Sequence, residues 1–258
     1  MLQNMFDNKK SISFEIFPPK KDGAFDTVFE TLDALGKLKP DFISVTYGAG
    51  GSRSGETIQI ASYIQNTLGI DAMAHVTCVG SRKEQLLKVC EALKENHIEH
   101  ILALRGDRPR DMSDEQFLSR DFAHASDMMS FIREHTDLHM AGACYPEKHF
   151  EAFSMESDLN NLRRKQEAGA EFFISQLFFD NDFYYSFLEK AAKKGITVPI
   201  CAGIMPITSA KQIGTTITLA GSSVPKALAD ILATYGDNPE EMRKAGIDYA
   251  IRQIRDLQ

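Results

Sequence analysis

The chain has 258 residues, a net charge of −7 at pH 7 and four cysteines. This length fits a single α/β barrel, which typically has about 250 residues. The acidic balance argues against nucleic acid or an anionic membrane surface as a partner, because phosphate binding needs clustered cations. No apolar stretch approaches the roughly 20 residues of a membrane span, and residues 1–10 lack the apolar core of a signal peptide.

The cysteines lie far apart, without a CxxC pair, so we expect no zinc or iron–sulfur site. Three of them fall in or beside apolar runs, where a free thiol packs as a small hydrophobic group. We therefore expect unpaired thiols and a cytoplasmic protein. The four are Cys78, Cys90, Cys144 and Cys201.

Strand-like apolar runs alternate with helical patterns along the whole chain. Ser81 is the expected N-cap of the third helix, Gly169 the expected stop of the fifth, and 107–119 the longest loop. Strands are predicted at 11–17, 42–47, 71–78, 100–106, 139–145, 171–179 and 198–205. Helices are predicted at 24–38, 55–68, 82–96, 121–135, 156–168, 181–194, 208–220, 224–235 and 238–257.

This alternation predicts an α/β fold of the TIM-type (β/α)8 barrel class. Only seven strands are predicted, because the last helix ends where an eighth strand should begin. We interpret the chain as a single catalytic barrel domain over residues 1–258 that is C-terminally truncated, in preference to a barrel that closes in another way. A missing strand would leave open backbone edges that favour association.

The predicted strands end in polar residues, whereas packing alone would predict aliphatic ends. Glu15, set between aromatic residues, is expected to have a raised pKa, unless a Lys or Arg pairs with it. Arg105 and Asp107 could bind a ligand or pair with each other, and Gln176 could bind a ligand or the backbone. For His75, a hydrogen-bonded core histidine is the better interpretation.

Two further sets have simpler interpretations. One face of the fifth helix carries Asp158, Asn161, Arg164 and Lys165, and a solvated charged face is the default for such a set. Phe178 and Phe179 are expected to lie in the core. The glycine-rich run 48–51 does not match the GxGxxG dinucleotide fingerprint, and no GxxxxGK[ST] loop is present, so no Rossmann domain is expected.

Seven short motifs occur in a fixed order from about residue 11 to the end. They are Phe14-Glu15-Ile16-Phe17-Pro18-Pro19, Val45-Thr46-Tyr47-Gly48-Ala49, Ala74-His75-Val76-Thr77-Cys78, Ala103-Leu104-Arg105-Gly106-Asp107, Tyr145-Pro146-Glu147-Lys148-His149, the run from Asp158 to Lys165, and Gln176-Leu177-Phe178-Phe179-Asp180. Each motif is weak by itself, but the set in this order resembles the methylenetetrahydrofolate reductase family, flavin enzymes that make 5-methyltetrahydrofolate.

The resemblance implies a role for each matching residue. Glu15 falls on the family's proton donor, Asp107 on a catalytic residue that also reaches the folate, and Gln176 on a folate-binding glutamine. FAD would be the cofactor and NADH or NADPH the co-substrate, used in a ping-pong reaction of one-carbon metabolism. The implied cofactor-binding residues are Thr46, Tyr47, His75, Leu104, Arg105, Gly106, Asp107, His124, Ala125, Tyr145, His149, Asp158, Asn161, Arg164 and Lys165.

The chain departs from the family pattern in two further places. His124 stands where the family usually has a tyrosine, and Ile231-Leu232 where it has a stacking phenylalanine. Two other functions therefore stay open: a flavin-free folate reductase, and a non-catalytic folate- or flavin-binding subunit of a larger complex. A homo-oligomer is also left open by the resemblance.

Overall fold

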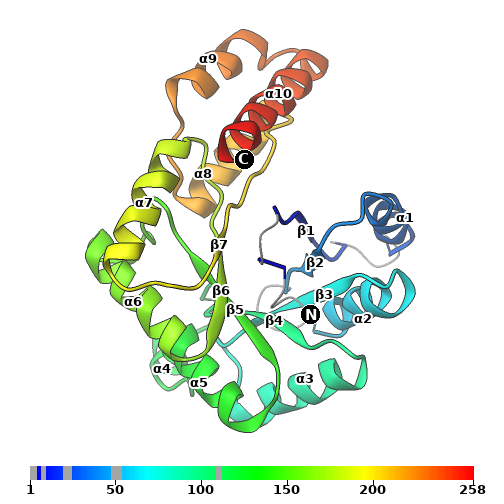
Figure 1. The fold of residues 1–258 in the computed structure, drawn as a ribbon, viewed down its shortest axis with the longest axis vertical. Helices are drawn as coiled ribbons and strands as arrows, with labels where there is room; N and C mark the ends of the chain where they lie inside the picture. Colours follow the sequence, from blue (N-terminus) through cyan, green and yellow to red (C-terminus); the bar gives the residue numbers. More distant parts are fainter. Residues whose placement is uncertain (1–4, 7–9, 20–24, 48–53, 109–111) are drawn as a thin grey trace. The chain divides into compact units, whose positions relative to one another are not determined.

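Seven parallel strands form one sheet in the order β1-β2-β3-β4-β5-β6-β7 (Figure 1). The computed structural model describes residues 5–6, 10–19, 25–47, 54–108 and 112–258. The fold class is therefore the predicted (β/α) barrel type, and the described residues contain seven of its eight strands. The strands are β1 (Ser13–Ile16), β2 (Phe42–Val45), β3 (Asp71–Thr77), β4 (His100–Leu104), β5 (His139–Cys144), β6 (Ala170–Ser175) and β7 (Ile200–Cys201).

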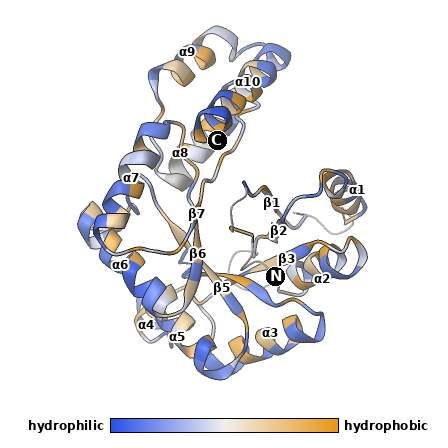
Figure 2. Cartoon of the chain, in the orientation of Figure 1, coloured by the Kyte–Doolittle hydropathy of each residue, from blue (hydrophilic) through white to orange (hydrophobic). Residues whose placement is uncertain are grey.

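Helices alternate with the strands as far as β7, and the larger helices carry both hydrophilic and hydrophobic stretches (Figure 2). An apolar stripe is what a helix needs to pack against a sheet. The helices are α1 (Phe25–Gly36), α2 (Ser54–Ser62), the π-helical η3 (Tyr63–Thr67), α3 (Lys83–Glu95), α4 (Asp114–Leu118), α5 (Ala125–His135), α6 (Met155–Glu167), α7 (Asn181–Lys193), α8 (Ala210–Ala220), α9 (Lys226–Tyr235) and α10 (Pro239–Leu257).

The chain divides into two compact units. The first comprises Met1–Gly142 with Lys165–Phe172, and the second comprises Ala143–Arg164 with Phe173–Gln258. The interpretation as one truncated catalytic domain stays a prediction. Across the described residues, no helix is both long and apolar enough to cross a membrane.

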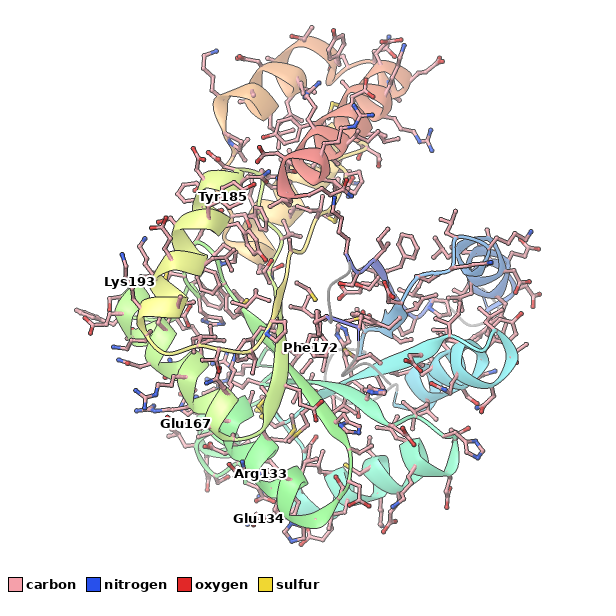
Figure 3. The ribbon with its side chains drawn as sticks, in the orientation of Figure 1. Arg133, Glu134, Glu167, Phe172, Tyr185 and Lys193 are labelled. Carbon is pink, nitrogen blue, oxygen red and sulfur yellow. The ribbon has the colours of Figure 1, made fainter. Side chains whose placement is uncertain are left out.

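Aromatic residues build part of the core of the first unit. The ring of Phe172, labelled in Figure 3, lies 5.1 Å from that of Phe6 and 6.1 Å from that of Phe42. Arg133 of α5 donates to the backbone oxygen of Glu167 at 2.8 Å, where α6 ends. Gly169 follows with φ of 115°, a conformation that favours glycine, so it is the helix stop that the sequence predicted.

In the second unit, α8, α9 and α10 share an apolar core. Phe179, Ile207, Leu228 and Met242 are all buried there. The hydroxyl of Tyr249 on α10 donates to the backbone oxygen of Phe179 at 2.6 Å, which joins α10 to the segment after β6. Phe178 and Phe179 are each 1% exposed, so their predicted place in the core is confirmed.

The prediction that Ser81 is the N-cap of the third helix was wrong. The Ser81 hydroxyl donates to the backbone oxygen of Thr77 at 3.1 Å, and α3 begins two residues later. The first turn of α3 instead uses Gln85, which accepts from the Arg82 nitrogen at 3.0 Å, and Asp121, which accepts from the Lys83 nitrogen at 2.9 Å. Asp121 lies in a distant segment of the chain, so local sequence could not predict its contact with α3.

The predicted loop 107–119 contains the short helix α4. Ser113 and Gln116 form a reciprocal capping box, with the Ser113 oxygen 3.1 Å from the Gln116 nitrogen and the Gln116 oxygen 2.9 Å from the Ser113 nitrogen. The spacing Ser-x-x-Gln is the sequence signal that predicts such a start. The glycine-rich segment 48–51 lies outside the described residues.

Candidate active site

The carboxyl ends of β1 to β4 bring several predicted site residues to one edge of the first unit's sheet. Parallel pairing aligns Glu15 with Ser44 and Ser44 with Met73. Side chains alternate between the two faces of a strand, so His75, two residues beyond Met73, lies on the same face as Glu15. Glu15 and His75 are therefore neighbours through strand register.

Contact between these two side chains is direct. Nε2 of His75 lies 3.4 Å from Oε2 of Glu15. His75 is 5% exposed, whereas 44% of the Glu15 side-chain surface faces solvent. Burial raises the pKa of Glu15 above its ordinary value and lowers the pKa of His75 to about 4. Both shifts favour the uncharged forms, a carboxylic acid beside a neutral imidazole.

The sequence left open that a Lys or Arg forms an ion pair with Glu15. The described part of the chain contains no such ion pair. The interpretation of His75 as a hydrogen-bonded core histidine was half right. The ring is buried, but its Nε2 has no hydrogen-bond partner among the described residues. A buried nitrogen without a partner is unusual in proteins and marks a position where a ligand or a mobile proton is expected.

Thr46 lies at the end of β2 and is held by its backbone. Its nitrogen donates to the oxygen of Ile16 at 2.9 Å, and its oxygen accepts from the hydroxyl of Thr57 at 3.0 Å. Thr57 is 1% exposed and was missed by the sequence analysis. A polar residue on the buried face at the start of α2 was the available signal. Tyr47 follows Thr46 and is partly buried.

The segment after β4 is fixed by the segment after β3. The nitrogens of Cys78 and Val79 donate to the oxygens of Leu104 and Arg105 at 3.1 and 2.8 Å. Gly106 has φ of 80°, and a Cβ there would lie 2.8 Å from Cγ1 of Val79. Glycine is therefore required at this position both by conformation and by space.

Arg105 and Asp107 extend from this fixed segment. Nε of Arg105 donates to the oxygen of Gly106 at 3.2 Å. Asp107 is exposed and forms no hydrogen bond or ion pair with another described residue. The alternative of a structural Arg–Asp pair is thus wrong within the described chain, and the Asp107 carboxylate is available to a ligand.

His124 and Ala125 begin α5. The backbone nitrogen of His124 donates to Oδ2 of Asp127 at 2.8 Å, and Ala125 is 5% exposed. The His124 side chain is exposed. Lys165 also belongs to the first unit, where it is partly buried near the end of α6.

In the second unit, the loop after β5 packs onto the start of α6. The nitrogen of His149 donates to Oδ2 of Asp158 at 2.9 Å, and the His149 ring meets the Tyr145 ring edge-on at 4.6 Å. Nη1 of Arg164 donates to Oδ1 of Asn161 at 3.3 Å on the exposed side of the helix. The predicted face therefore exists, and its start presents the helix N-terminus, which attracts phosphate groups.

Gln176 comes directly after β6. Its nitrogen donates to the oxygen of Cys144 at 2.7 Å, and its Oε1 accepts from the nitrogen of Leu177 at 2.9 Å. The predicted alternative of pairing with backbone is thus observed for the side-chain oxygen. The side-chain nitrogen has no partner in the described part of the chain, so it can donate to a ligand.

All four cysteines are free, and three of them are buried. Over the residues that the structure describes, no group of three or more His, Cys, Asp or Glu side chains could hold a metal ion.

Comparison with known proteins decides the family. The family model described as methylenetetrahydrofolate reductase matches residues 1–258. The chain belongs to the methylenetetrahydrofolate reductase family. A 5,10-methylenetetrahydrofolate reductase of Pectobacterium carotovorum is 34% identical over 247 residues, covering 96% of this chain and 81% of that relative. Methylenetetrahydrofolate reductase (NADH) 1 of Arabidopsis thaliana is 33% identical over 260 residues, covering 96% of this chain and 44% of that relative.

A solved structure supports the fold independently. An uncharacterized protein from Clostridium thermocellum, described as binding two copies of 5-methyl-5,6,7,8-tetrahydrofolic acid, superposes with a TM-score of 0.61. The superposition covers 98% of this chain and 87% of the other, at 16% sequence identity. At that identity the likeness shows a common fold, so membership of the methylenetetrahydrofolate reductase family rests on sequence.

Proposed function

We propose that this protein reduces 5,10-methylenetetrahydrofolate to 5-methyltetrahydrofolate, with FAD as cofactor and NADH as the preferred electron donor, in a ping-pong reaction. The observation that carries the proposal is the Glu15 carboxyl group. Burial raises its pKa, and it stands at the carboxyl end of β1 in a chain of this reductase family. A carboxylic acid that keeps its proton near neutral pH can serve as a general acid.

The chemistry assigned to Glu15 is a single proton transfer. Its carboxyl group donates a proton to the bridging nitrogen of the folate's five-membered ring, the bond from that nitrogen to the methylene carbon breaks, and an electrophilic iminium forms. Hydride addition to this carbon gives the methyl group. FAD, when bound, would take the hydride from NADH and supply it to the folate.

Substrate binding is assigned to Asp107 and Gln176 in addition to Glu15. Asp107 has an exposed carboxylate that accepts hydrogen bonds from a pterin edge, and Gln176 keeps a side-chain nitrogen that has no partner among the described residues. The negative charge of Asp107 would also disfavour an anionic reduced flavin and so favour hydride donation.

Cofactor binding is assigned to donors and acceptors that fit an FAD molecule. His75 on β3 and the fixed backbone of Thr46 and Leu104–Asp107 suit the polar atoms of a flavin ring. The start of α6, with Asp158, Asn161, Arg164 and Lys165 on that helix, suits a ribose and a diphosphate. Tyr47, His124, Ala125, Tyr145 and His149 complete the proposed set.

NADH is preferred to NADPH in this proposal because plant relatives carry NADH in their names. The protein would act in one-carbon metabolism, and its methyl product would be used in methionine biosynthesis. It would be cytoplasmic and form a homo-oligomer.

The decisive experiment is the absorbance spectrum of freshly purified protein, before and after anaerobic addition of NADH, followed by 5,10-methylenetetrahydrofolate. We expect flavin bands that bleach with NADH and return with the folate. A colourless protein that still oxidises NADH in the presence of folate would instead be a flavin-free reductase. Flavin bands that neither NADH nor NADPH bleaches would identify a non-catalytic binding subunit.

A further inference from the structure

The contact between His75 and Glu15 requires a proton on one of its two atoms. Nε2 of His75 is buried, lies 3.4 Å from Oε2 of Glu15 and has no hydrogen-bond partner among the described residues. A neutral imidazole nitrogen without a hydrogen accepts a hydrogen bond, and so does a carboxylate oxygen. Two acceptors at this distance repel each other, so the contact is favourable only when one of them is protonated.

The surroundings place that proton on the carboxyl group. Burial is the cause of both pKa shifts, upward for Glu15 and downward for His75, and no charged group in the described chain contributes to either. A charged imidazolium beside a carboxylate would require the opposite directions. His75 therefore remains neutral, and one of its two ring nitrogens carries no hydrogen and can accept one.

We propose that His75 is the positioning residue for Glu15: its Nε2 accepts the carboxyl proton of Glu15, holds that carboxyl group in its acid form and fixes its direction. The consequence for catalysis rests on the proposed function, whereas the hydrogen bond itself does not. A hydrogen bond made only by the neutral form of an acid disfavours ionisation. His75 thus adds to the effect of burial on the same carboxyl group.

The same geometry favours recovery of the proton. Once Glu15 has transferred its proton, its carboxylate lies 3.4 Å from an Nε2 that carries no hydrogen. That arrangement is repulsive, and it is relieved when the carboxyl group takes up a proton again. His75 therefore biases Glu15 toward the state that is ready for the next proton transfer, without itself changing charge.

The first test needs no cofactor or activity. The Glu15 carboxyl carbon is titrated by NMR in isotope-labelled protein, with Glu15→Gln used to assign the signal, and the His75 nitrogens are observed in the same samples. We expect His75 to be neutral with its hydrogen on Nδ1, and His75→Asn to lower the midpoint of the Glu15 titration by about one pH unit, a tenfold change in ionisation. An unchanged midpoint, or a hydrogen on Nε2, would overturn the proposal.

The second test compares half-reactions. In His75→Asn protein that retains flavin, folate reduction should decline at a pH about one unit lower than in the native protein, whereas the pH profile of flavin reduction by NADH should keep its native midpoint. His75→Gln should restore most of the native profile, because its longer side chain returns an amide group to the region of Nε2. Equal loss of both half-reactions without a shifted profile would mean that His75 serves only the flavin, against the proposal.

His100→Asn is the matched control, because it removes another buried neutral histidine from the same sheet, on β4. It should leave the Glu15 titration and the pH profile unchanged. If the native protein proves to bind no flavin and to reduce no folate, the proposed function fails, yet the NMR titration still decides whether His75 holds the proton of Glu15. Should His75→Asn not fold, the titration of His75→Gln and the nitrogen signals of the native protein decide instead.

Discussion

Glu15 shows how one residue can combine exposure with a raised pKa. Its side chain keeps 44% of its surface open to solvent, yet the protein around it disfavours the charged form. Glu15→Gln removes the transferable proton and little else. We expect folate reduction to fall by about 10²- to 10⁴-fold, the usual contribution of a general acid, while NADH still reduces the flavin. Stopped-flow measurement of each half-reaction checks this.

A matched control is Glu171→Gln, which changes a carboxylate of the same sheet near the start of β6. That carboxylate pairs with His139 at 2.7 Å and has no assigned role in the reaction. Both half-reactions should keep their native rates in this variant. A Glu15→Gln protein that lost both half-reactions to the same degree would show that Glu15 supports the site and does not donate the proton.

Gly106 illustrates a residue whose side chain is excluded. Its φ of 80° disfavours other residues, and an added Cβ would lie 2.8 Å from Val79 and 2.9 Å from Thr77. We expect Gly106→Ala to lower the free energy of unfolding by about 2–4 kcal/mol, from backbone strain plus overpacking. Denaturant unfolding followed by circular dichroism gives the value.

Gly69→Ala separates the cost of backbone strain from the cost of overpacking. Gly69 has φ of 65°, but nothing lies within 4 Å of the position that an added Cβ would take, so only the backbone cost of about 1 kcal/mol applies. If Gly106→Ala were no more destabilising than Gly69→Ala, the close packing of the segment after β4 would be contradicted.

The sequence showed which residues belong to the candidate site better than it showed what their side chains contact. Glu15 and His75 could be selected because they stand near the ends of predicted strands. The contact between them joins residues 60 positions apart along the chain and depends on the register of three strands. Local pattern contains no register, so neither the contact nor the orphaned nitrogen of His75 could be predicted.

The start of α3 is decided by an acid from another segment. Asp121 accepts from the Lys83 nitrogen at 2.9 Å and contacts the Arg82 guanidinium at 2.8 Å. The backbone hydrogen bond from Lys83, followed by the side-chain hydrogen bond from Arg82, lowers the pKa of Asp121. Asp121→Ala should cost about 1 kcal/mol of unfolding free energy, the usual value of a helix cap. Urea unfolding at pH 7 measures it.

The sign of the pH dependence follows from the direction of that shift. A lowered carboxyl pKa in the folded protein contributes stability above the unfolded pKa of about 3.9, and this stability is lost as the pH falls through the folded value. The difference in unfolding free energy between the native protein and Asp121→Ala should therefore shrink only in that acid range. Ser81→Ala is the control, since Ser81 does not cap the helix. If Ser81→Ala lost more unfolding free energy than Asp121→Ala, the predicted N-cap at Ser81 would be right after all.

Elements with a strong period were predicted within a few residues, as for α1, α7 and α10. The strand predicted over 198–205 was too long, because β7 is only Ile200–Cys201. Beyond it, the Gly203 nitrogen donates to the hydroxyl of Ser175 at 2.9 Å in place of a neighbouring backbone oxygen. An apolar run shows that a segment is buried, but it does not show which atom accepts its hydrogen bonds.

For the whole chain, the order of the motifs was more informative than any one element. The alternation of apolar runs predicted the seven-stranded sheet, and the motifs from about residue 11 to the end predicted the family; both are confirmed. The roles of individual residues in the reaction stay predictions, because they depend on contacts with ligands, and the arrangement of strands and helices does not define those contacts.

Stability of the whole protein should fall as the pH drops from 7 to 5. Burial lowers the pKa of His75 to about 4 and also lowers the pKa of His100, whose ring stacks on that of His139 at 5.2 Å. In the unfolded chain both histidines titrate near 6.5. Between about 4 and 6.5 the unfolded state therefore binds more protons, so the unfolding free energy declines as pH falls through this window.

Thermal melts at pH 5, 6, 7 and 8 test this, with His75→Asn and His100→Asn beside the native protein. The native melting temperature should drop at pH 5, and each variant should lose part of that dependence because it removes one histidine that must charge on unfolding. Glu15 acts in the opposite sense, since a raised carboxyl pKa contributes stability below the unfolded value and loses it as pH rises through the folded value. Glu15→Gln should therefore gain stability relative to the native protein at pH 8. Histidine variants that lose as much melting temperature at pH 5 as the native protein would contradict the neutral, buried state of both histidines.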